Sequence, residues 1–298
     1  MPVDPSRSER YRRSRSLAVT ALRSVSAALL LAGAGPIFQA PATVVDCLSS
    51  SRAKARWKLP PAMREVSGLA LTDDGRLLLH NDEQGVVMAL DAATGRVVGN
   101  YQLGAIPPSG DFEGIAVAGR TLVLTTSDGV LYEMDLPLKA TSGGILPFTV
   151  TATGVGARCE VEGLSYDRTD RVLLLACKKP RKKSLRKQVA VFRWDLAARA
   201  MARPDRVVFN EADLGNRQGQ GFHPSAIEVD PRSGQWIMLA SADKAVAAVD
   251  RSGRVIATAP LGRHHRQPEG LALGADGSVY VSDEGGHGAG TVTVYACR

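Results

Sequence analysis

Cysteine, aromatic residues and the common catalytic motifs are scarce or missing in this sequence. It has only four cysteines and no CxxC pair, which argues against the usual zinc motifs and against thioredoxin-type redox chemistry. No GxSxG, HExxH or GxxxxGK[ST] motif occurs, so nothing indicates a nucleophile-elbow hydrolase, a zinc peptidase or a P-loop NTPase. Aromatic residues make up 5% of the chain, and the three tryptophans are most simply packing residues.

No apolar run is long enough to cross a membrane. The stretch SVSAALLLAGAG at residues 24–35 has 12 residues, too few to span a bilayer as a helix. It follows a cluster of arginines and precedes APA at residues 40–42, the order found in export signals. We predict a signal peptide over residues 1–42, cleaved after Ala42, with an uncleaved anchor helix as the alternative. The protein is then exported, periplasmic or extracellular, and has no transmembrane helix after signal removal.

Positive charge is concentrated at the same end of the chain. The formal net charge is +7, but residues 1–42 contain six arginines against only Asp4 and Glu9. The rest of the chain is therefore only mildly basic, which argues against nucleic acid as a partner. We expect a monomer, with an unidentified ligand or protein of the cell envelope as partner.

A sustained helical period is also missing, and short strands take its place. Runs such as RLLLHND, TLVLTTS and RVLLLAC alternate with turn sequences such as TDDG and DRTD. A polar phrase precedes these runs five times: EVSGLA, DFEGIA, EVEGLS, HPSAIE and QPEGLA. Its equivalent positions are 46, 49, 63 and 44 residues apart, namely Ser67, Glu113, Glu162, Ser225 and Glu269.

Four strands in each period of about 40–50 residues are typical of a β-propeller. We predict an all-β, five-bladed propeller of four-stranded antiparallel blades over residues 63–298. A six-bladed ring is the alternative, and it would need a hidden repeat in the long third interval. That interval contains two visible insertions, KKPRKKSLRK and EADLGNRQGQG.

The fifth blade lacks an outer strand. The N-terminal closing segment, residues 43–62, contains a predicted strand that no other blade uses. We expect ARWKLP at residues 55–60 to complete the ring, which also removes two open sheet edges. That closure brings Cys47 near Cys297, so we pair them. Cys159 and Cys177 flank one hairpin, so we pair these as well. Free thiols are the alternative, which export disfavours.

The first strand of each propeller blade lines the central axis, so the repeated phrase predicts a polar ring at one mouth. Three carboxylates in such a ring, Glu113, Glu162 and Glu269, need a counter-charge. Oxygen ligands of this kind suit Ca²⁺. The alternative is that the acids accept backbone hydrogen bonds and bind nothing. Further polar residues are expected at or beside the ring: Ser67, Asp82, Glu83, Asp128, His223, Ser225, Asp283 and Glu284.

The phrases VSGLALTDDGRLLLHNDEQGVVMALD, DFEGIAV, VEGLSYD, HPSAIEVDPRSG and QPEGLAL resemble the SdiA-regulated (YjiK-like) family of exported bacterial β-propellers. The resemblance covers roughly residues 63–296 and implies a propeller fold, an extracytoplasmic location and a central Ca²⁺. The residues carried over are Glu113, Glu162 and Glu269, each in an intact EG[LI] phrase. The family often has an acidic residue after the lysine that follows the third blade's second strand. Here Lys178 is followed by Lys179 and Pro180 instead.

Two weaker resemblances concern function. SGLALTDDGRLLLHNDEQGVVMALD is similar to the first blade of calcium-activated apyrases, and the EGLA phrases are similar to esterase-like phytases. Either would imply a metal-dependent phosphohydrolase, with the basic loop at residues 178–187 attracting phosphate. A solvated surface insertion explains that loop more simply. The sequence thus leaves two hypotheses: a binding or scaffold propeller that holds Ca²⁺, or a Ca²⁺-dependent phosphohydrolase.

Overall fold

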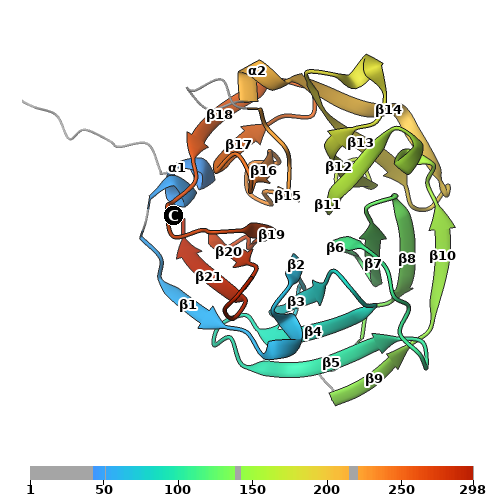
Figure 1. The fold of residues 1–298 in the computed structure, drawn as a ribbon, viewed down its shortest axis with the longest axis vertical. Helices are drawn as coiled ribbons and strands as arrows, with labels where there is room; N and C mark the ends of the chain where they lie inside the picture. The colour runs from blue at the N-terminus through green and yellow to red at the C-terminus, as the bar shows by residue number, and fades with distance from the viewer. Residues whose placement is uncertain (1–42, 51, 138–141, 215–220, 298) are drawn as a thin grey trace, which may run out of the picture. The chain divides into compact units, whose positions relative to one another are not determined.

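In a computed structural model, residues 43–297 are described apart from 51, 138–141 and 215–220. Five sheets surround one central axis, each with its first strand innermost (Figure 1). The five-bladed propeller is therefore confirmed. The predicted signal peptide lies outside the described residues. No helix in the described part of the chain has both the length and the apolar character to cross a membrane.

The blades are numbered in chain order from the first strand pair. Blade 1 consists of β2 (Val66–Leu71), β3 (Arg76–Asn81), β4 (Val86–Asp91), β5 (Val97–Leu103) and β9 (Ser142–Leu146). Blade 2 consists of β6 (Phe112–Ala118), β7 (Thr121–Thr126), β8 (Val130–Asp135) and β10 (Phe148–Ala152). Blade 3 consists of β11 (Cys159–Asp167), β12 (Val172–Pro180), β13 (Gln188–Asp195) and β14 (Ala200–Asn210).

Blade 4 consists of β15 (Ala226–Val229), β16 (Trp236–Ala240), β17 (Ala245–Val249) and β18 (Val255–Pro260). Blade 5 consists of β19 (Pro268–Leu273), β20 (Ser278–Asp283), β21 (Thr291–Ala296) and β1 (Ala55–Lys58). The short helices are α1 (Val44–Ser49), α2 (Glu211–Leu214), η1 (Pro61–Met63), η2 (Val155–Ala157) and η3 (Lys183–Leu185).

Burial along the strands explains why inner and outer strands differ in sequence. Inner strands such as β3 and β16 are buried on both faces and read as continuous apolar runs. Outer strands such as β18 alternate half-buried and exposed residues, because one face is open to solvent. The core is accordingly divided into five apolar clusters, each packed between two neighbouring blades.

The N-terminal strand closes the ring as predicted. In Figure 1 the blue strand β1 lies beside the red strand β21, and the two pair antiparallel from Ala55 opposite Val294 to Lys58 opposite Thr291. The six-bladed alternative is wrong. The long third interval instead extends the hairpin of β12 and β13 and adds α2 before blade 4.

Both predicted disulfides are confirmed. Cys47, in α1, is bonded to Cys297 directly after β21, with their Cα atoms 5.7 Å apart. Cys159 at the start of β11 is bonded to Cys177 in β12, also with a Cα separation of 5.7 Å. The first bridge reinforces the closure that β1 makes, because it ties the N-terminal segment to the end of the last blade.

One strand departs from the expected pattern of four per blade. β9 lies between β8 and β10 in sequence, yet it joins blade 1 as a fifth, parallel strand beside β5. The register runs from Asn100 opposite Ser142 to Leu103 opposite Leu146. This strand covers the outer edge of blade 1, an edge that would otherwise present unpaired backbone groups.

Candidate functional site

The repeated polar phrase places its key residue in a β-bulge. The pairing between first and second strands skips one residue in four blades: Ser67, Glu113, Glu162 and Glu269. A bulged residue has no direct partner on the next strand, and its side chain is turned away from the regular sheet direction. Blade 4 lacks the bulge, because β15 begins at Ala226 opposite Leu239. The bulge, rather than simple alternation, is what presents these side chains at the axial mouth.

The glycine of the phrase is required by how closely the five inner strands approach one another. A Cβ on Gly114 would lie 2.8 Å from the backbone nitrogen of Leu164 in blade 3. On Gly163 it would lie 3.0 Å from the nitrogen of Ile227 in blade 4. On Gly270 it would lie 2.9 Å from the nitrogen of Leu69 in blade 1. The carboxylate–glycine pair therefore combines an axial side chain with room for the neighbouring strand.

The Gly114→Ala substitution is expected to lower the free energy of unfolding by about 1–3 kcal/mol, the usual cost of overpacking. The obstructing atoms belong to the Leu164 backbone and Cβ, so they cannot swing aside. Gly288→Ala is the matched control, because its nearest atom is 3.4 Å away. Urea denaturation measures both variants, and equal stability for the two would contradict this account of the phrase.

Three glutamates of the repeated phrase line one narrow cavity at the axis. Glu113, Glu162 and Glu269 all border it, together with Ser67. The Ser67 hydroxyl donates to Glu113 Oε2 at 3.0 Å, and the ammonium group of Lys178 forms an ion pair with Glu162. Glu162 is buried, and Oε2 of Glu269 is buried without a hydrogen-bond partner among the described residues.

The protonation of these glutamates reflects a surplus of negative charge. Burial and the nearby Glu162 raise the pKa of Glu113 to about 9. Burial and the same neighbour raise the pKa of Glu269 to about 8. Burial also raises the pKa of Glu162, although Lys178 opposes it, and the pKa of Lys178 is itself raised by Glu162. At neutral pH the ring therefore retains protons that a further cation would release.

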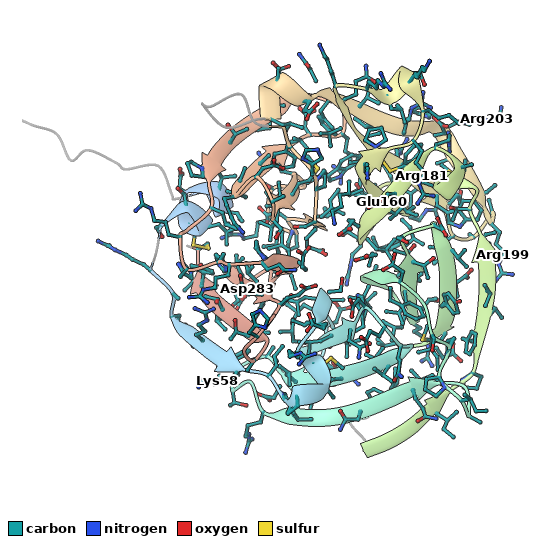
Figure 2. All side chains as sticks on the ribbon, viewed as in Figure 1. Lys58, Glu160, Arg181, Arg199, Arg203 and Asp283 are labelled. Carbon is teal, nitrogen blue, oxygen red and sulfur yellow. A yellow bond between two sulfur atoms is a disulfide. The ribbon has the colours of Figure 1, made fainter. Side chains whose placement is uncertain are left out.

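More acids surround the mouth. Burial, with Glu65, Asp82 and Glu162 nearby, raises the pKa of Glu284 to about 7. Burial likewise raises the pKa of Asp82, one of whose oxygens is buried without a hydrogen-bond partner among the described residues. In Figure 2, Glu160 and Arg181 lie nearer the centre of the ring, whereas Lys58, Arg199 and Arg203 lie at its outer edge. The mouth is thus an acidic centre within a mildly basic molecule.

Several other predicted residues lie in the loops of this mouth but do not line the axial cavity. Ser225 is buried and donates from its hydroxyl to the Pro268 carbonyl at 2.7 Å, which links blades 4 and 5. His223 is exposed, and its Nδ1 lies 3.1 Å from Asp243. Asp128 is exposed and forms an ion pair with Arg181 at 2.8 Å.

Contacts within the loops of the mouth involve three more of the predicted residues, Asp283, Glu284 and Glu83. Asp283 is buried, lies 2.7 Å from His265 Nδ1, and accepts a hydrogen bond from the Gln267 backbone. Glu284 accepts a hydrogen bond from the Gln267 side chain. Glu83 is exposed, and its backbone carbonyl accepts from Gly110. These contacts hold the loops around the ring in place.

As it stands, the ring is an ion-paired cluster and not a preformed metal cage. Among the described residues, no three acidic, histidine or cysteine side chains are arranged so that they could hold a metal ion together. The Lys178 ammonium is the built-in counter-charge that the three carboxylates need. The carboxylates and the orphaned Glu269 oxygen still suit a hard cation, provided that the lysine side chain moves aside.

Sequence reasoning missed Lys178 and Asp111 as parts of the site. Lys178 was considered only as the family's lysine, with no acid after it, and as part of the basic loop, although its position at the end of β12 puts it at the mouth. Asp111 opens the DFEGIA phrase and hydrogen-bonds to Glu113, which requires a proton on one of the two carboxyl groups. A phrase with two acids so close together was the available signal for this contact.

Comparison with known proteins identifies a family and confirms the fold. The model of the SdiA-regulated family matches residues 50–286. No curated protein matches the sequence. Among solved structures, Myxococcus xanthus glutaminyl cyclase is similar at a TM-score of 0.52 and 14% identity, covering 82% of this chain and 94% of that one. The PQQ-bound aldose sugar dehydrogenase of Streptomyces coelicolor gives 0.51 and 14%, covering 83% and 99%. At such identity these likenesses concern the fold alone.

Proposed function

The chain belongs to the SdiA-regulated family, and we propose that it is an exported, non-enzymatic binding propeller whose axial mouth takes up a cation, most simply Ca²⁺. Glu113, Glu162 and Glu269 would hold the ion. The observation that carries the proposal is that these three glutamates line one cavity, while the only ion pair that they form with a described residue is that of Glu162 with Lys178. Two disulfides are compatible with an exported protein.

The raised pKa values support this assignment because they reveal charge that the fold does not neutralise. Glu113 and Glu269 have pKa values of about 9 and 8, so both are largely protonated at pH 7. A divalent cation would compete with these protons and allow the carboxylates to ionise. Ion binding should therefore release protons and become tighter as the pH rises from 6 to 9.

Calcium is expected to raise the melting temperature of the wild-type mature protein above its value in a chelator. A ligand that binds only the folded state stabilises it by about 2.7 kcal/mol when free ligand exceeds its dissociation constant a hundredfold. In the chelator, Glu113 binds a proton in the folded state at pH values where the unfolded chain does not. Protonation of Glu113 therefore stabilises the folded state at pH 5, and this stabilisation declines as the pH rises toward 9. Melts at pH 6 and pH 8.5 should show the larger calcium effect at pH 8.5.

Matched variants separate the ring from the rest of the mouth. Glu113→Gln and Glu269→Gln keep the side-chain size but remove the charge, so they should fold and lose the calcium response. Glu83→Gln, at an exposed residue of the same mouth, should keep it. A wild-type melting temperature that is the same in chelator and in millimolar Ca²⁺ would overturn the cation site.

The phosphohydrolase alternative predicts that the protein hydrolyses phosphate compounds, whereas a binding propeller would not. Incubating the mature protein with nucleotides, inositol phosphates and a generic phosphoester, with and without Ca²⁺, should release no phosphate if the protein is a binding propeller. Calcium-dependent phosphate release that Glu113→Gln abolishes would replace the binding assignment with an enzymatic one.

A further inference from the structure

A second cavity lies at the opposite end of the inner strands from the glutamate ring. Its volume is about 850 Å³, within the range of pockets for small organic ligands. Every blade contributes an apolar or aromatic side chain from the end of its first strand: Leu71, Val117, Tyr166, Val229 and Leu273. The two mouths of the propeller thus differ in chemistry, because one presents carboxylates and the other an apolar ring.

The cavity extends outward along the junction where the ring closes. Trp57 of β1 and Tyr280 of β20 border it, with ring centroids 6.1 Å apart. The Tyr280 hydroxyl donates to the Ala92 carbonyl of blade 1 at 2.9 Å, so this wall is held between the last blade and the first. Aromatic groups that are fixed in this way can receive a flat or apolar ligand at little entropic cost.

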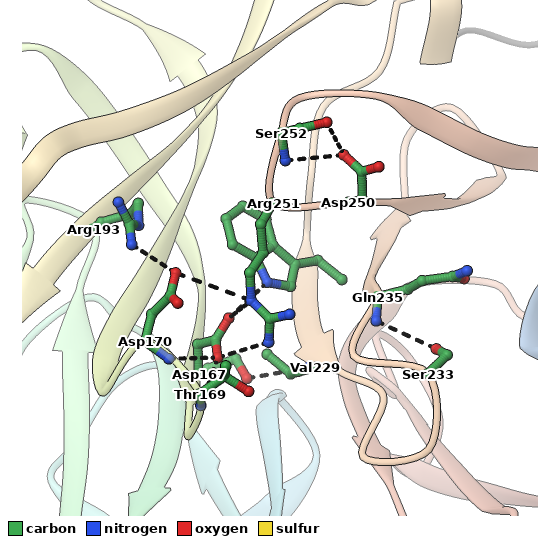
Figure 3. Close-up of polar contacts among 12 residues, drawn as sticks. Asp167, Thr169, Asp170, Arg193, Val229, Ser233, Gln235, Asp250, Arg251 and Ser252 are labelled. Atoms are coloured by element: carbon green, nitrogen blue, oxygen red, sulfur yellow. Dashed lines mark hydrogen bonds and ion pairs between the residues drawn. The ribbon is translucent and has the colours of Figure 1, made fainter.

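Most acids at this mouth are neutralised by cations of the protein itself. The buried Asp167 accepts two hydrogen bonds from Arg251, at 2.7 and 2.9 Å, and a third from Trp236 Nε1 at 3.1 Å (Figure 3). Arg76 pairs with Asp74 at 2.8 Å on the blade 1 side. These pairs fix the rim, and they leave those carboxylates satisfied.

Asp230 and Asp73 follow the same pattern. Arg232 lies 3.6 Å from Asp230, whose other oxygen accepts from the Ser233 hydroxyl at 2.6 Å. Arg168 forms a 2.8 Å ion pair with Asp73. Both pairs lie in turns that follow first strands, so the ends of three blades carry their own counter-charges.

Three acids that border this cavity, Asp91, Asp276 and Glu228, form no ion pair with a described residue. Asp91 and Asp276 accept hydrogen bonds from Thr94 and Ser278 in their own turns.

The third acid, Glu228, differs because it lies on an inner strand. It borders the cavity from β15, half-buried, next to the apolar ring residue Val229. Its hydrogen-bond partners are Ser165 and the Val229 backbone, and no cationic side chain of the described residues is within 4.0 Å of it. Burial raises the pKa of Glu228 to about 8, with Arg168 opposing only weakly. Glu228 thus lacks the cation that Asp167 and Asp230 have on the two neighbouring turns.

We propose that this cavity is a second ligand site that binds a small organic amine, with its ammonium group on Glu228 and its apolar or aromatic body against Tyr166, Val229 and Leu273. An ammonium supplies the missing counter-charge and three hydrogen-bond donors. The apolar ring buries the rest of the ligand. The arginines of the rim give no comparable place for a carboxylate or phosphate, because each is already engaged by an acid. Lys54, which also borders the cavity without an ion pair to a described residue, is exposed to solvent.

Benzylamine and its neutral isostere benzyl alcohol test the proposal directly. Isothermal titration of the wild-type mature protein at pH 7 should show benzylamine binding at least tenfold more tightly than benzyl alcohol. The benzylamine heat should differ between buffers of different ionisation enthalpy, because binding releases the Glu228 proton. Charged groups that face this carboxyl are Arg168, the Asp230–Arg232 pair and the Asp167–Arg251 pair.

Two variants separate this site from the glutamate ring. Glu228→Gln should reduce the affinity for benzylamine to that of benzyl alcohol, while Glu269→Gln, at the other mouth, should leave it unchanged. Val229→Phe fills the apolar ring and should weaken both probes, even if Glu228→Gln does not fold. Undetectable binding of benzylamine to the wild type, or equal binding by wild type and Glu228→Gln, would overturn the proposal. Neither result depends on whether Ca²⁺ binds at the other mouth.

Discussion

Replacing Lys178 by glutamine is expected to increase the affinity of the axial mouth for Ca²⁺ by at least tenfold. The lysine ammonium pairs with Glu162 and is the counter-charge to the ring, so it competes with any added cation for the same carboxylate. Two unit charges 4 Å apart repel by about 4 kcal/mol at an effective dielectric constant of 20, and a tenfold change in affinity needs only about 1.4 kcal/mol. Removing the charge should therefore give a gain that is readily measured by titration calorimetry.

Stability should change in two opposite directions in this variant. In a chelator, Glu162 loses its partner, so the melting temperature should fall below that of the wild type. In millimolar Ca²⁺ the ion replaces the ammonium, so the calcium-induced rise should be larger than in the wild type. Lys179→Gln is the control, because Lys179 is exposed and forms no ion pair with a described residue. If Lys178→Gln binds Ca²⁺ no better than Lys179→Gln, the lysine is a permanent structural counter-charge and the cation proposal fails.

The repeated phrase allowed the architecture of the ring to be predicted because its spacing is set by local chemistry. Each first strand begins with a similar phrase, and in four of the five blades this phrase contains a glycine that permits close packing at the axis. Ring closure also located β1 and the Cys47–Cys297 bridge, since a closed ring leaves one place for the additional strand, whereas the Cys159–Cys177 bridge followed from the hairpin that the two residues flank. β9 escaped prediction because a parallel strand added from another blade has no signature in the order of the sequence.

The site was predictable only in part, for a different physical reason. Which residues line the axis follows from the phrase, but which charges meet there depends on bulges and on long side chains from second strands. Lys178 reaches Glu162 across such a bulge, and the register shift that allows it is not visible in the sequence. The amine cavity was missed because its apolar ring uses ordinary strand ends, such as Val229 and Leu273, that look like core residues. Glu228, within the HPSAIE phrase, was its one polar signal.

Removing the ring-closing disulfide by Cys47→Ser with Cys297→Ser is expected to lower the free energy of unfolding by roughly 5 kcal/mol. The bridge joins residues 250 apart in sequence, so it restricts the unfolded chain over almost the whole propeller. The Cys159–Cys177 bridge spans only 18 residues, and its removal should cost roughly 3 kcal/mol in the same loop-entropy account. Urea denaturation of the two double-serine variants measures the difference directly.

The loss of stability on removal of the Cys47–Cys297 bridge should be greatest where the ring closes. Without the bridge, α1 keeps its apolar contacts through Val44, Val45 and Leu48, and β1 keeps its four-residue pairing with β21. These contacts are the remaining latch, so hydrogen exchange should accelerate first in β1 and β21, well before the inner strands that carry the glutamate ring. The calcium response should survive at temperatures where the variant is folded. A cost for the ring-closing bridge no greater than that for the short bridge would show that β1 and α1 alone hold the propeller closed, and that the bridge constrains the folded ring less than its span implies.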